Sequence, residues 1–446
     1  MKPKTLFLVH FFIILSLNFN AQEGFRFLNP SKKMVQVDFK LIHNLIVIPL
    51  KINNKELSFI LDSGSNKTIL FNLSDNDTIG LKNIEKVELQ GLGKGNSVEA
   101  LLSQNNTIAI QNIQSENESI YIILRDFFDL SSKMGTTIHG IIGHDLIKNF
   151  ILKINYSTKK IVFYKPETFV YKKCKKCEVF PMQIIRRKPF IKAKVQLDTI
   201  GNSLTDVNLL IDSGGSDALW LFVDSEKNIK TPKKFFIDIL GEGLSGTIYG
   251  NRSRIPKFKV GSYEIYQPTV SFLDSLTTLN ARIYKERNGS LGAGILRRFH
   301  VWIDYPNKKL TLKKNQNFSD KFNYNMSGLE VVYNGKQLVR EQETKTYKDG
   351  YSQNIETNST ISFVTSFSYK FKPSFKIKSV VKNSPSDKAG LKGDDIIVSI
   401  NGIPVHNFNL SKIVSKFQEN DHKKIKLQID RNGQKLNFEF RLKQKI

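Results

Sequence analysis

Residues 59–70 read Phe-Ile-Leu-Asp-Ser-Gly-Ser-Asn-Lys-Thr-Ile-Leu, and residues 209–220 read Leu-Leu-Ile-Asp-Ser-Gly-Gly-Ser-Asp-Ala-Leu-Trp. In both stretches an apolar run typical of a buried strand continues into Asp-Ser-Gly, a common turn composition. The aspartates of the two stretches, Asp62 and Asp212, are 150 positions apart. A single Asp-Ser-Gly indicates no more than a turn, so the meaning of this pair depends on whether the surrounding sequence is also repeated.

The surrounding sequence is repeated at nearly the same offset. Residues 92–95 (Leu-Gly-Lys-Gly) match residues 240–243 (Leu-Gly-Glu-Gly) at an offset of 148 positions. Residues 141–143 (Ile-Ile-Gly) begin a longer stretch that matches the one beginning at residues 290–292 (Ser-Leu-Gly), at an offset of 149. Three matches in one order at a nearly constant offset indicate an internal duplication.

Short apolar runs separated by turn residues predict a fold that is mostly β. Apolar alternation predicts a hairpin over residues 45–61, and residues 145–150 fit a short helix before a second hairpin over residues 151–164. We therefore expect two homologous β-lobes, residues 22–170 and 171–320, related by a pseudo-twofold axis.

Paired carboxylates can hydrolyse a peptide bond without a metal or a covalent intermediate. A pseudo-twofold axis can bring the loop that carries Asp62 next to the loop that carries Asp212. Two carboxylates at that range share one proton over a broad pH range, because both cannot ionise easily. The ionised member can then take a proton from water while the protonated member polarises the scissile carbonyl.

Other catalytic classes have weaker support in the sequence. His139 and His144 flank the Ile-Ile-Gly segment, but their spacing and the lack of further ligands do not fit a metal site. Neither Ser63 nor Ser213 lies in the Gly-x-Ser-x-Gly turn of a serine hydrolase. We expect neither a metal nor a cofactor.

The paired motifs resemble those of the retropepsin-like and pepsin-like aspartic proteases, in a bacterial branch that carries both lobes in one chain. The resemblance covers about residues 35–315 and implies an aspartic-type endopeptidase in which Asp62 and Asp212 are catalytic. It also implies residues that support the catalytic loops, namely Ser63, Gly64, Ser65, Ile141, Ile142, Gly143, Ser213, Gly214, Gly215, Leu291 and Gly292. It further implies flap residues, namely Gly93, Gly95, Gly241 and Gly243. Two positions depart from the family pattern: Gly215 replaces a small hydroxyl residue or Ala, and Ser290 replaces an apolar residue.

Residues 326–446 resemble a PDZ domain, because the characteristic elements Ser384-Pro385, Ala389-Gly390-Leu391, Gly393-Asp394 and Ile400-Asn401-Gly402 stand in order. A helix is expected after Asn409 and a hairpin around Asn432-Gly433. The resemblance implies that residues 340–369 are an insertion and that the carboxylate-binding loop consists of Gly328, Leu329, Glu330 and Val331. Such a domain binds a peptide C-terminus at a sheet edge; the alternative is a domain that packs on the lobes and binds nothing.

The N-terminus has the pattern of a secretory signal. Lys2 and Lys4 precede an apolar run over residues 6–17, and Ala21 offers a small residue for cleavage. We therefore expect residues 1–21 to be a signal peptide and the mature protein to be periplasmic or extracellular. A retained membrane anchor is the alternative reading of the same run.

The chain has two cysteines, Cys174 and Cys177. No further Cys or His lies nearby to complete a zinc site, so a local disulfide is expected in an oxidising compartment, with a redox pair as the alternative.

The formal net charge of +26 favours anionic partners such as envelope components or acidic peptides. The lysines are spread along the sequence, and no basic helix or RNA-binding motif concentrates them, so nucleic-acid binding is not expected. We expect a monomer that acts on peptide or protein substrates. The alternative function is a catalytically silent peptide-binding or scaffold protein of the cell envelope.

Overall fold

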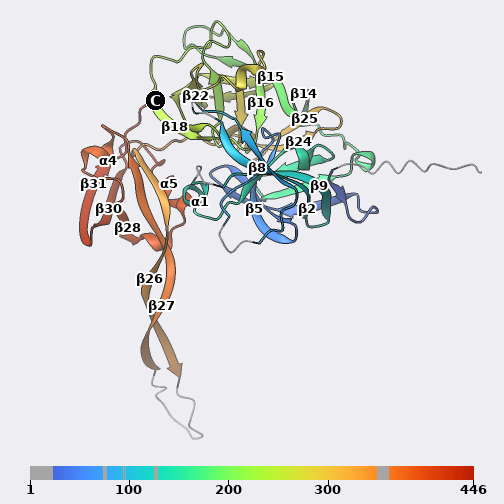
Figure 1. Ribbon diagram of the computed structural model, residues 1–446. Coiled ribbons are helices and arrows are strands. Elements are labelled where there is room, and N and C mark those ends of the chain that lie inside the picture. Colours follow the sequence, from blue (N-terminus) through green and yellow to red (C-terminus); the bar gives the residue numbers. More distant parts are fainter. Residues whose placement is uncertain (1–23, 74–77, 94, 96, 125–128, 349–360) are drawn as a thin grey trace, which may run out of the picture.

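The computed structural model describes residues 24–73, 78–93, 95, 97–124, 129–348 and 361–446. Within these residues the chain forms four β-sheets: one in each lobe, one shared between the lobes and one in the C-terminal domain. Figure 1 shows the N-terminal lobe in blue to teal, the C-terminal lobe in green to yellow, and the C-terminal domain in orange and red beside them. The expected class, two β-lobes followed by a β-rich domain, is confirmed. The expected signal peptide lies outside the described residues.

A nine-stranded sheet forms most of the N-terminal lobe. Its strands are β1 (Arg26–Phe27), β3 (Lys40–Ile42), β4 (Leu45–Ile52), β5 (Lys55–Leu61), β6 (Thr68–Leu70), β7 (Ile84–Leu89), β8 (Val98–Ile110), β9 (Ile113–Ile122) and β10 (Gly140–Ile142). The expected hairpin of β4 and β5 turns at Asn53 and Asn54, both at positive φ as a two-residue type I′ turn requires. Strand β10 lies between β5 and β6 and runs parallel to β5, so Ile142 stands beside Leu61, the residue before Asp62.

A ten-stranded sheet repeats this arrangement in the C-terminal lobe. Its strands are β14 (Gln183–Ile185), β15 (Lys188–Gln196), β16 (Thr205–Asp212), β17 (Leu219–Phe222), β18 (Phe236–Gly243), β19 (Gly246–Arg254), β20 (Lys257–Val260), β21 (Tyr263–Tyr266), β22 (Thr269–Leu273) and β23 (Gly289–Gly292). Strand β23 lies between β16 and β17 and runs parallel to β16, with Leu291 beside Ile211. The surroundings of Asp212 therefore match those of Asp62.

The two lobes share a six-stranded sheet. Its strands are β2 (Met34–Asp38), β11 (Ile151–Asn155), β12 (Lys160–Tyr164), β13 (Cys177–Pro181), β24 (Phe299–Asp304) and β25 (Lys309–Lys314). Strands β11 and β24 pair in antiparallel register with Lys153 opposite Trp302. Because the lobes repeat at an offset of 149, Trp302 is the counterpart of Lys153. A residue that pairs with its own counterpart lies on the symmetry axis, so the expected pseudo-twofold axis passes through this pair.

The C-terminal domain has a sheet and a hydrophobic core of its own. Its strands are β26 (Leu329–Lys348), β27 (Ile361–Val380), β28 (Ile396–Ile400), β29 (Ile403–Pro404), β30 (Lys424–Arg431) and β31 (Gln434–Arg441). Strand β26 forms one edge of the sheet. Of the insertion expected over residues 340–369, the described residues 340–348 and 361–369 form the outer part of the β26–β27 ribbon, which projects away from the body of the molecule in Figure 1.

The helices are short and sit at the ends of strands. They are α1 (Leu130–Met134), α2 (His144–Ile147), α3 (Ala293–Leu296), α4 (Pro385–Lys388) and α5 (Leu410–Lys416), with 3₁₀ turns at Pro166–Thr168, Ala281–Ile283 and Val405–Asn407. As expected, Asn409 caps α5: its side chain accepts a hydrogen bond from the Lys412 amide at 2.9 Å. Helix α2 ends three residues earlier than the helix predicted over residues 145–150, because strand β11 begins at Ile151. Among the described helices none is long and apolar enough to cross a membrane.

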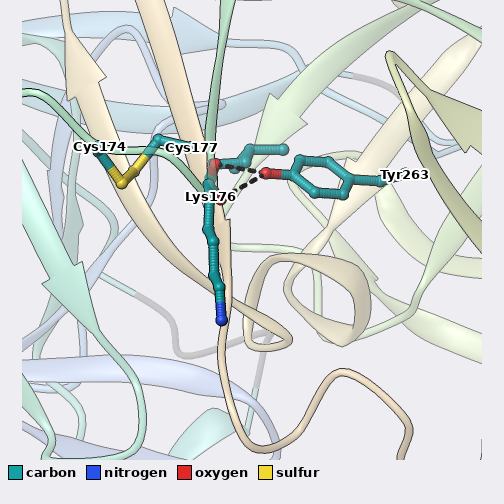
Figure 2. Close-up of a disulfide and its surroundings, with 5 residues drawn as sticks. Cys174, Lys176, Cys177 and Tyr263 are labelled. Atoms are coloured by element: carbon teal, nitrogen blue, oxygen red, sulfur yellow. Dashed lines mark hydrogen bonds between the residues drawn. A yellow bond between two sulfur atoms is a disulfide. The ribbon is translucent and has the colours of Figure 1, made fainter.

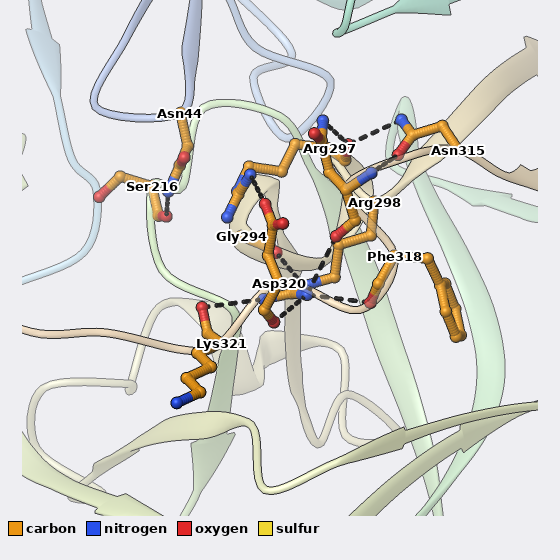
Figure 3. Close-up of polar contacts among 10 residues, drawn as sticks. Asn44, Ser216, Gly294, Arg297, Arg298, Asn315, Phe318, Asp320 and Lys321 are labelled. Atoms are coloured by element: carbon orange, nitrogen blue, oxygen red, sulfur yellow. Dashed lines mark hydrogen bonds and ion pairs between the residues drawn. The ribbon is translucent and has the colours of Figure 1, made fainter.

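Arg298 fixes the segment that leads from the C-terminal lobe to the C-terminal domain (Figure 3). Its guanidinium is buried and stacks 3.6 Å from the centre of the Phe322 ring. It donates to the carbonyl oxygens of Gly294, Asn317, Phe318, Asp320 and Lys321. A guanidinium carries five N–H donors in a fixed fork, so it can hold such a turn of backbone carbonyls together.

Cys174 and Cys177 form a disulfide in the segment that enters strand β13 (Figure 2). The same segment is held by the Tyr263 hydroxyl, which donates to the carbonyl oxygens of Lys176 and Leu312. The cysteines therefore close a local loop at the edge of the shared sheet.

Candidate active site

Two carboxyl groups face each other between the lobes. Asp62 follows β5 and Asp212 ends β16. A Cβ placed on Gly64 would lie 3.1 Å from Asp62 Oδ1 and 3.2 Å from Asp212 Oδ1. The two carboxyl groups therefore flank a single glycine, and the fold brings together the two aspartates that the duplication singled out.

Two glycines are required because the chain packs closely around Asp62, from the opposite lobe at Gly214 and from the same lobe at Gly143. A Cβ on Gly214 would lie 2.3 Å from Asp62 Cγ, in the opposite lobe. A Cβ on Gly143 would lie 2.1 Å from the Asp62 carbonyl oxygen. Any larger residue at either position would displace the carboxyl group of Asp62 or the backbone that carries it.

A symmetrical set of hydrogen bonds joins the loops that carry Asp62 and Asp212. The Ser63 amide donates to Ser213 Oγ at 2.9 Å, and the Ser213 amide donates to Ser63 Oγ at 3.0 Å. The two hydroxyls donate across the axis to the carbonyl oxygens of Ile211 and Leu61, at 2.7 and 2.8 Å. Both serines are buried, so these four bonds hold the loops in one relative position without competition from water.

The remaining support residues lie behind the loops. The Asp62 amide donates to the Ile142 carbonyl at 2.9 Å, and the Gly292 amide donates to the Ala218 carbonyl at 3.0 Å. The hydroxyl of Ser65 donates to the Lys67 carbonyl at 2.8 Å. Gly215, at the position of Ser65 in the other lobe, has no side chain and cannot form the equivalent of the Ser65 bond. Its backbone carbonyl accepts a hydrogen bond from the Ala293 amide at 2.7 Å. Ile141 and Leu291 pair with the strands that carry the two aspartates.

The electrostatics of the pair favour one shared proton. Burial and the charge of Asp212 raise the pKa of Asp62 to about 7, against a smaller opposing effect of the hydrogen bond from the Gly64 amide. That amide donates to Asp62 Oδ1 at 2.7 Å. At mildly acidic pH the pair therefore holds a proton that an isolated surface aspartate would have lost.

Two basic residues next to the pair were not singled out from the sequence. Lys188 and Arg287 line the same cavity as Asp62 and Asp212. Burial lowers the pKa of Lys188, and burial lowers the pKa of Arg287 to about 10. Arg287 Nη2 donates to Ser290 Oγ at 2.8 Å, which accounts for the departure from an apolar residue at position 290.

Two hairpins meet over the cavity. The hairpins β7–β8 and β18–β19 carry the glycines expected in the flaps. The Ser245 amide donates to the Leu92 carbonyl at 3.0 Å, and the Gly95 amide donates to the Ser245 carbonyl at 2.7 Å. A Cβ on Gly243 would lie 2.1 Å from the Leu92 carbonyl oxygen, so this contact requires a glycine. Gly93 lies in the same contact, whereas Gly241 marks a bulge further along β18. The cavity beneath the flaps measures about 470 Å³.

The two histidines considered for a metal site have structural partners. His139 Nδ1 accepts a hydrogen bond from the Ser58 amide at 3.0 Å. His144 packs edge-on against Tyr305, and burial lowers its pKa to about 4. In the described part of the chain no group of three His, Cys, Asp or Glu side chains has the geometry of a metal site.

The expected peptide-binding residues of the C-terminal domain lie at the start of its edge strand. Gly328 precedes β26 at a φ of 85°, whereas Leu329, Glu330 and Val331 form the first residues of the strand rather than a loop. The loop itself is residues 325–328, and Ser327 Oγ accepts from the Leu329 amide at 3.0 Å. The peptide-binding role of these residues remains a prediction.

Helix α1 of the N-terminal lobe covers the beginning of this edge strand (Figure 1). Lys133 Nζ lies 3.6 Å from Glu330 Oε1 in β26. Asp129, which precedes α1, lies 2.8 Å from Lys378 Nζ in β27. A Cβ on Gly135 would lie 3.1 Å from the Cβ of Leu410, the first residue of α5. Helix α1 and Gly135 thus occupy the space between β26 and α5, where an added strand would lie.

A second, larger hollow of about 1150 Å³ lies beside the disulfide on the shared sheet. Its described lining contains eight lysines and no acidic residue, together with the aromatic side chains Tyr164, Phe169, Tyr171 and Trp302. The lysines are Lys33, Lys153, Lys172, Lys173, Lys175, Lys176, Lys309 and Lys313. Four of these lysines are neighbours in the sequence, at residues 172–176, and the fold brings the other four to the same surface although they are dispersed along the chain.

Comparisons with known proteins agree with this domain order. A family model described as "Aspartyl protease" matches residues 48–146, and one described as "PDZ domain" matches residues 376–431. No curated protein matches the sequence. Among solved structures, an aspartic proteinase from Irpex lacteus aligns with a TM-score of 0.43 at 13% identity, over 65% of this chain and 100% of that chain. The chain therefore contains an aspartyl protease domain followed by a C-terminal PDZ domain.

Proposed function

We propose that the protein is an aspartic-type endopeptidase in which Asp62 and Asp212 activate a water molecule. The observation that carries the proposal is the pair of half-buried carboxyl groups that flank one glycine, on two loops joined by symmetrical hydrogen bonds. In this mechanism the ionised aspartate accepts a proton from water, and the protonated aspartate donates a hydrogen bond to the scissile carbonyl. The substrate lies extended between the lobes and beneath the flaps.

The rigidity of the pair supports this assignment. Acid–base catalysis between two carboxyl groups needs both of them held within a fraction of an ångström, because proton transfer depends steeply on geometry. The four cross-lobe hydrogen bonds of Ser63 and Ser213 provide that constraint. The raised pKa of Asp62 supplies the protonated partner at mildly acidic pH.

A statine-type transition-state mimic provides a direct test. Its hydroxyl takes the place of the attacking water, so it should raise the melting temperature of the wild type and not that of the Asp62→Asn/Asp212→Asn variant. Equal shifts for both proteins would mean that the compound binds elsewhere. No shift for either folded protein would favour the alternative, a catalytically silent peptide-binding scaffold.

We further propose that the PDZ domain recruits or orients peptide ends and that this requires helix α1 to leave the edge of β26. The contacts of Asp129 with Lys378 and of Lys133 with Glu330 support the idea of a releasable cover. The cover is also connected to the protease core, because Ser131 Oγ accepts from the Asn72 side chain at 2.7 Å and the Phe71 amide donates to the His139 carbonyl beside β10.

The lysine-lined hollow supports a second role, docking of the exported protein on an anionic phospholipid surface of the cell envelope. Lysine side chains and interfacial aromatic residues together suit such a surface. Co-sedimentation with vesicles that contain anionic phospholipid should weaken steeply as salt is raised. Binding that ignores salt, or equal binding to neutral vesicles, would contradict this role.

A further inference from the structure

We propose that the C-terminal-lobe side of the cleft is a subsite for a substrate carboxylate, formed by Lys188 and Arg287. Cleaved peptides then carry Glu or Asp at a position next to the scissile bond. The inference rests on the proposed endopeptidase function and names the substrate class of that same site.

Strand pairing places Lys188 beside the catalytic pair. Strand β15 runs antiparallel to β16 with Phe190 opposite Leu210. Side chains alternate along a strand, so Lys188 shares a face with Phe190, and Asp212 shares a face with Leu210. Continuing the same register places Lys188 opposite Asp212. In the described part of the chain the Lys188 ammonium makes no direct hydrogen bond or ion pair, although the charges of Asp62 and Asp212 act on it from across the cavity. Because it lines the cavity, it can also contact a ligand.

Arg287 is held in the cavity wall by neutral hydrogen-bond partners, and the negative charges that act on it are those of Asp212 and Asp62. Only 5% of the residue is exposed. Its guanidinium donates from Nε to the Gly289 carbonyl at 3.2 Å and from Nη2 to Ser290 Oγ at 2.8 Å, and it lies 5.1 Å from the centre of the Phe222 ring. None of these partners carries a negative charge. A buried cation with neutral partners is costly unless an anion approaches it.

The duplication provides an internal comparison. In the N-terminal lobe β4 pairs with β5 with Val47 opposite Ile60, so Leu45 stands opposite Asp62 as Lys188 stands opposite Asp212. At the offset of 149, Ile138 is the counterpart of Arg287. Both apolar residues of the N-terminal lobe are thus replaced by cations in the C-terminal lobe. The two basic residues are a feature of one side of the cleft and are not required by the lobe fold.

The charge of the cavity fits the same conclusion. The charged residues among its described lining are the basic Lys67, Arg186, Lys188 and Arg287 and the acidic Asp62 and Asp212. Because the catalytic pair holds one proton, it carries about one negative charge. The cavity lining therefore carries a net positive charge before substrate binds. A substrate carboxylate would offset part of that charge.

Matched peptides test the subsite. Peptides that differ only by Glu or Gln at each position near the scissile bond would be compared by kcat/KM. We expect the wild type to prefer Glu at one position by about 10- to 100-fold, the range for a charged hydrogen bond in a partly buried site. Lys188→Leu introduces the leucine that the N-terminal lobe has at position 45. It should reduce the ratio of kcat/KM for Glu peptides over Gln peptides at least about tenfold. Lys192→Leu, an exposed lysine on the same strand, should keep the wild-type ratio.

Each other outcome has a defined meaning. A wild type with no Glu preference at any position would overturn the subsite. An equal loss on Glu and Gln peptides in Lys188→Leu would also overturn it, because the lysine would then act on the catalytic pair alone. Absence of cleavage would count against the proposed function instead. In that case statine-type inhibitors that carry Glu or Gln would still test the subsite, through the ratio of their Kd values.

Discussion

The raised pKa of Asp62 has a measurable consequence for stability. The carboxyl ordinarily titrates at 3.8, and burial beside Asp212 raises its pKa in the folded protein to about 7. A group whose pKa is raised by folding stabilises the protein while it is protonated in the folded state. That contribution is fully present below pH 3.8 and is lost as the pH rises through about 7. The contribution of Asp62 to stability should therefore fall between these two pH values, and comparison with a variant that lacks this carboxyl isolates it.

The magnitude follows from the same two pKa values. Each pKa unit corresponds to about 1.4 kcal/mol, so a rise from 3.8 to about 7 corresponds to about 4 kcal/mol at pH 8. Asp62→Asn cannot ionise and escapes this loss. We therefore expect the Tm of the variant minus the Tm of the wild type to increase as the pH is raised from 4 to 8. The increase should be on the order of 8 °C for a domain of this size.

Differential scanning calorimetry at a series of pH values measures this effect. Asp206→Asn is a suitable control because Asp206 is an exposed carboxylate on the same strand, β16. The control should follow the wild-type pH profile, whereas Asp62→Asn should diverge from it. A difference between Asp62→Asn and wild type that is the same at all pH values would refute the reasoning, because it would show that Asp62 ionises as readily in the folded protein as in the unfolded chain.

Three further predictions concern loops, flaps and the PDZ cover. Ser63→Ala and Ser213→Ala should each lower the free energy of unfolding, measured by urea unfolding, by about 1–3 kcal/mol. The loss in the double variant should be smaller than the sum of the two single losses, because the two hydroxyls belong to one hydrogen-bond network. Gly243→Ala should separate the flaps and raise KM more than it lowers kcat, which steady-state kinetics would show. Lys378→Glu should repel Asp129 and loosen the PDZ domain from the lobe; an unchanged radius of gyration by small-angle scattering would contradict this.

The proximity of Asp62 and Asp212 could be predicted from the sequence because the chain repeats itself. Each Asp-Ser-Gly taken alone indicates only a turn, but two copies at equivalent places in a duplicated lobe must approach each other across the symmetry axis. This prediction needed only order and spacing along the chain. A supporting position for Ser63 and Ser213 was implied by the family resemblance, and the structure shows the two serines bonded to each other.

Other features depend on strand register and on packing between distant segments. Lys188 and Arg287 are far apart in sequence, and nothing local indicates that they line one cavity. A residue-by-residue alignment of the two lobes pairs Arg287 with Ile138. This replacement of an apolar residue by a cation is the sequence signal that points to Arg287. Beyond Val339 the described side chains of β26 are polar, whereas in β27 Phe367, Tyr369 and Phe371 alternate with polar residues and are exposed. This alternation is typical of a strand, but it marks no face that belongs to a core. The contact between Gly135, which follows α1, and Leu410 joins two domains. The sequence of neither domain shows a pattern that predicts it.

The central claim is that Asp62 and Asp212 together hydrolyse peptide bonds. The most direct measurement is digestion of a diverse peptide mixture by the mature protein across pH 3 to 8, read by mass spectrometry, with the Asp62→Asn/Asp212→Asn variant alongside. We predict cuts that the wild type makes at mildly acidic pH and that are absent from the folded variant. The same cuts in both proteins, or no cuts by a folded wild type at any pH, would contradict the claim.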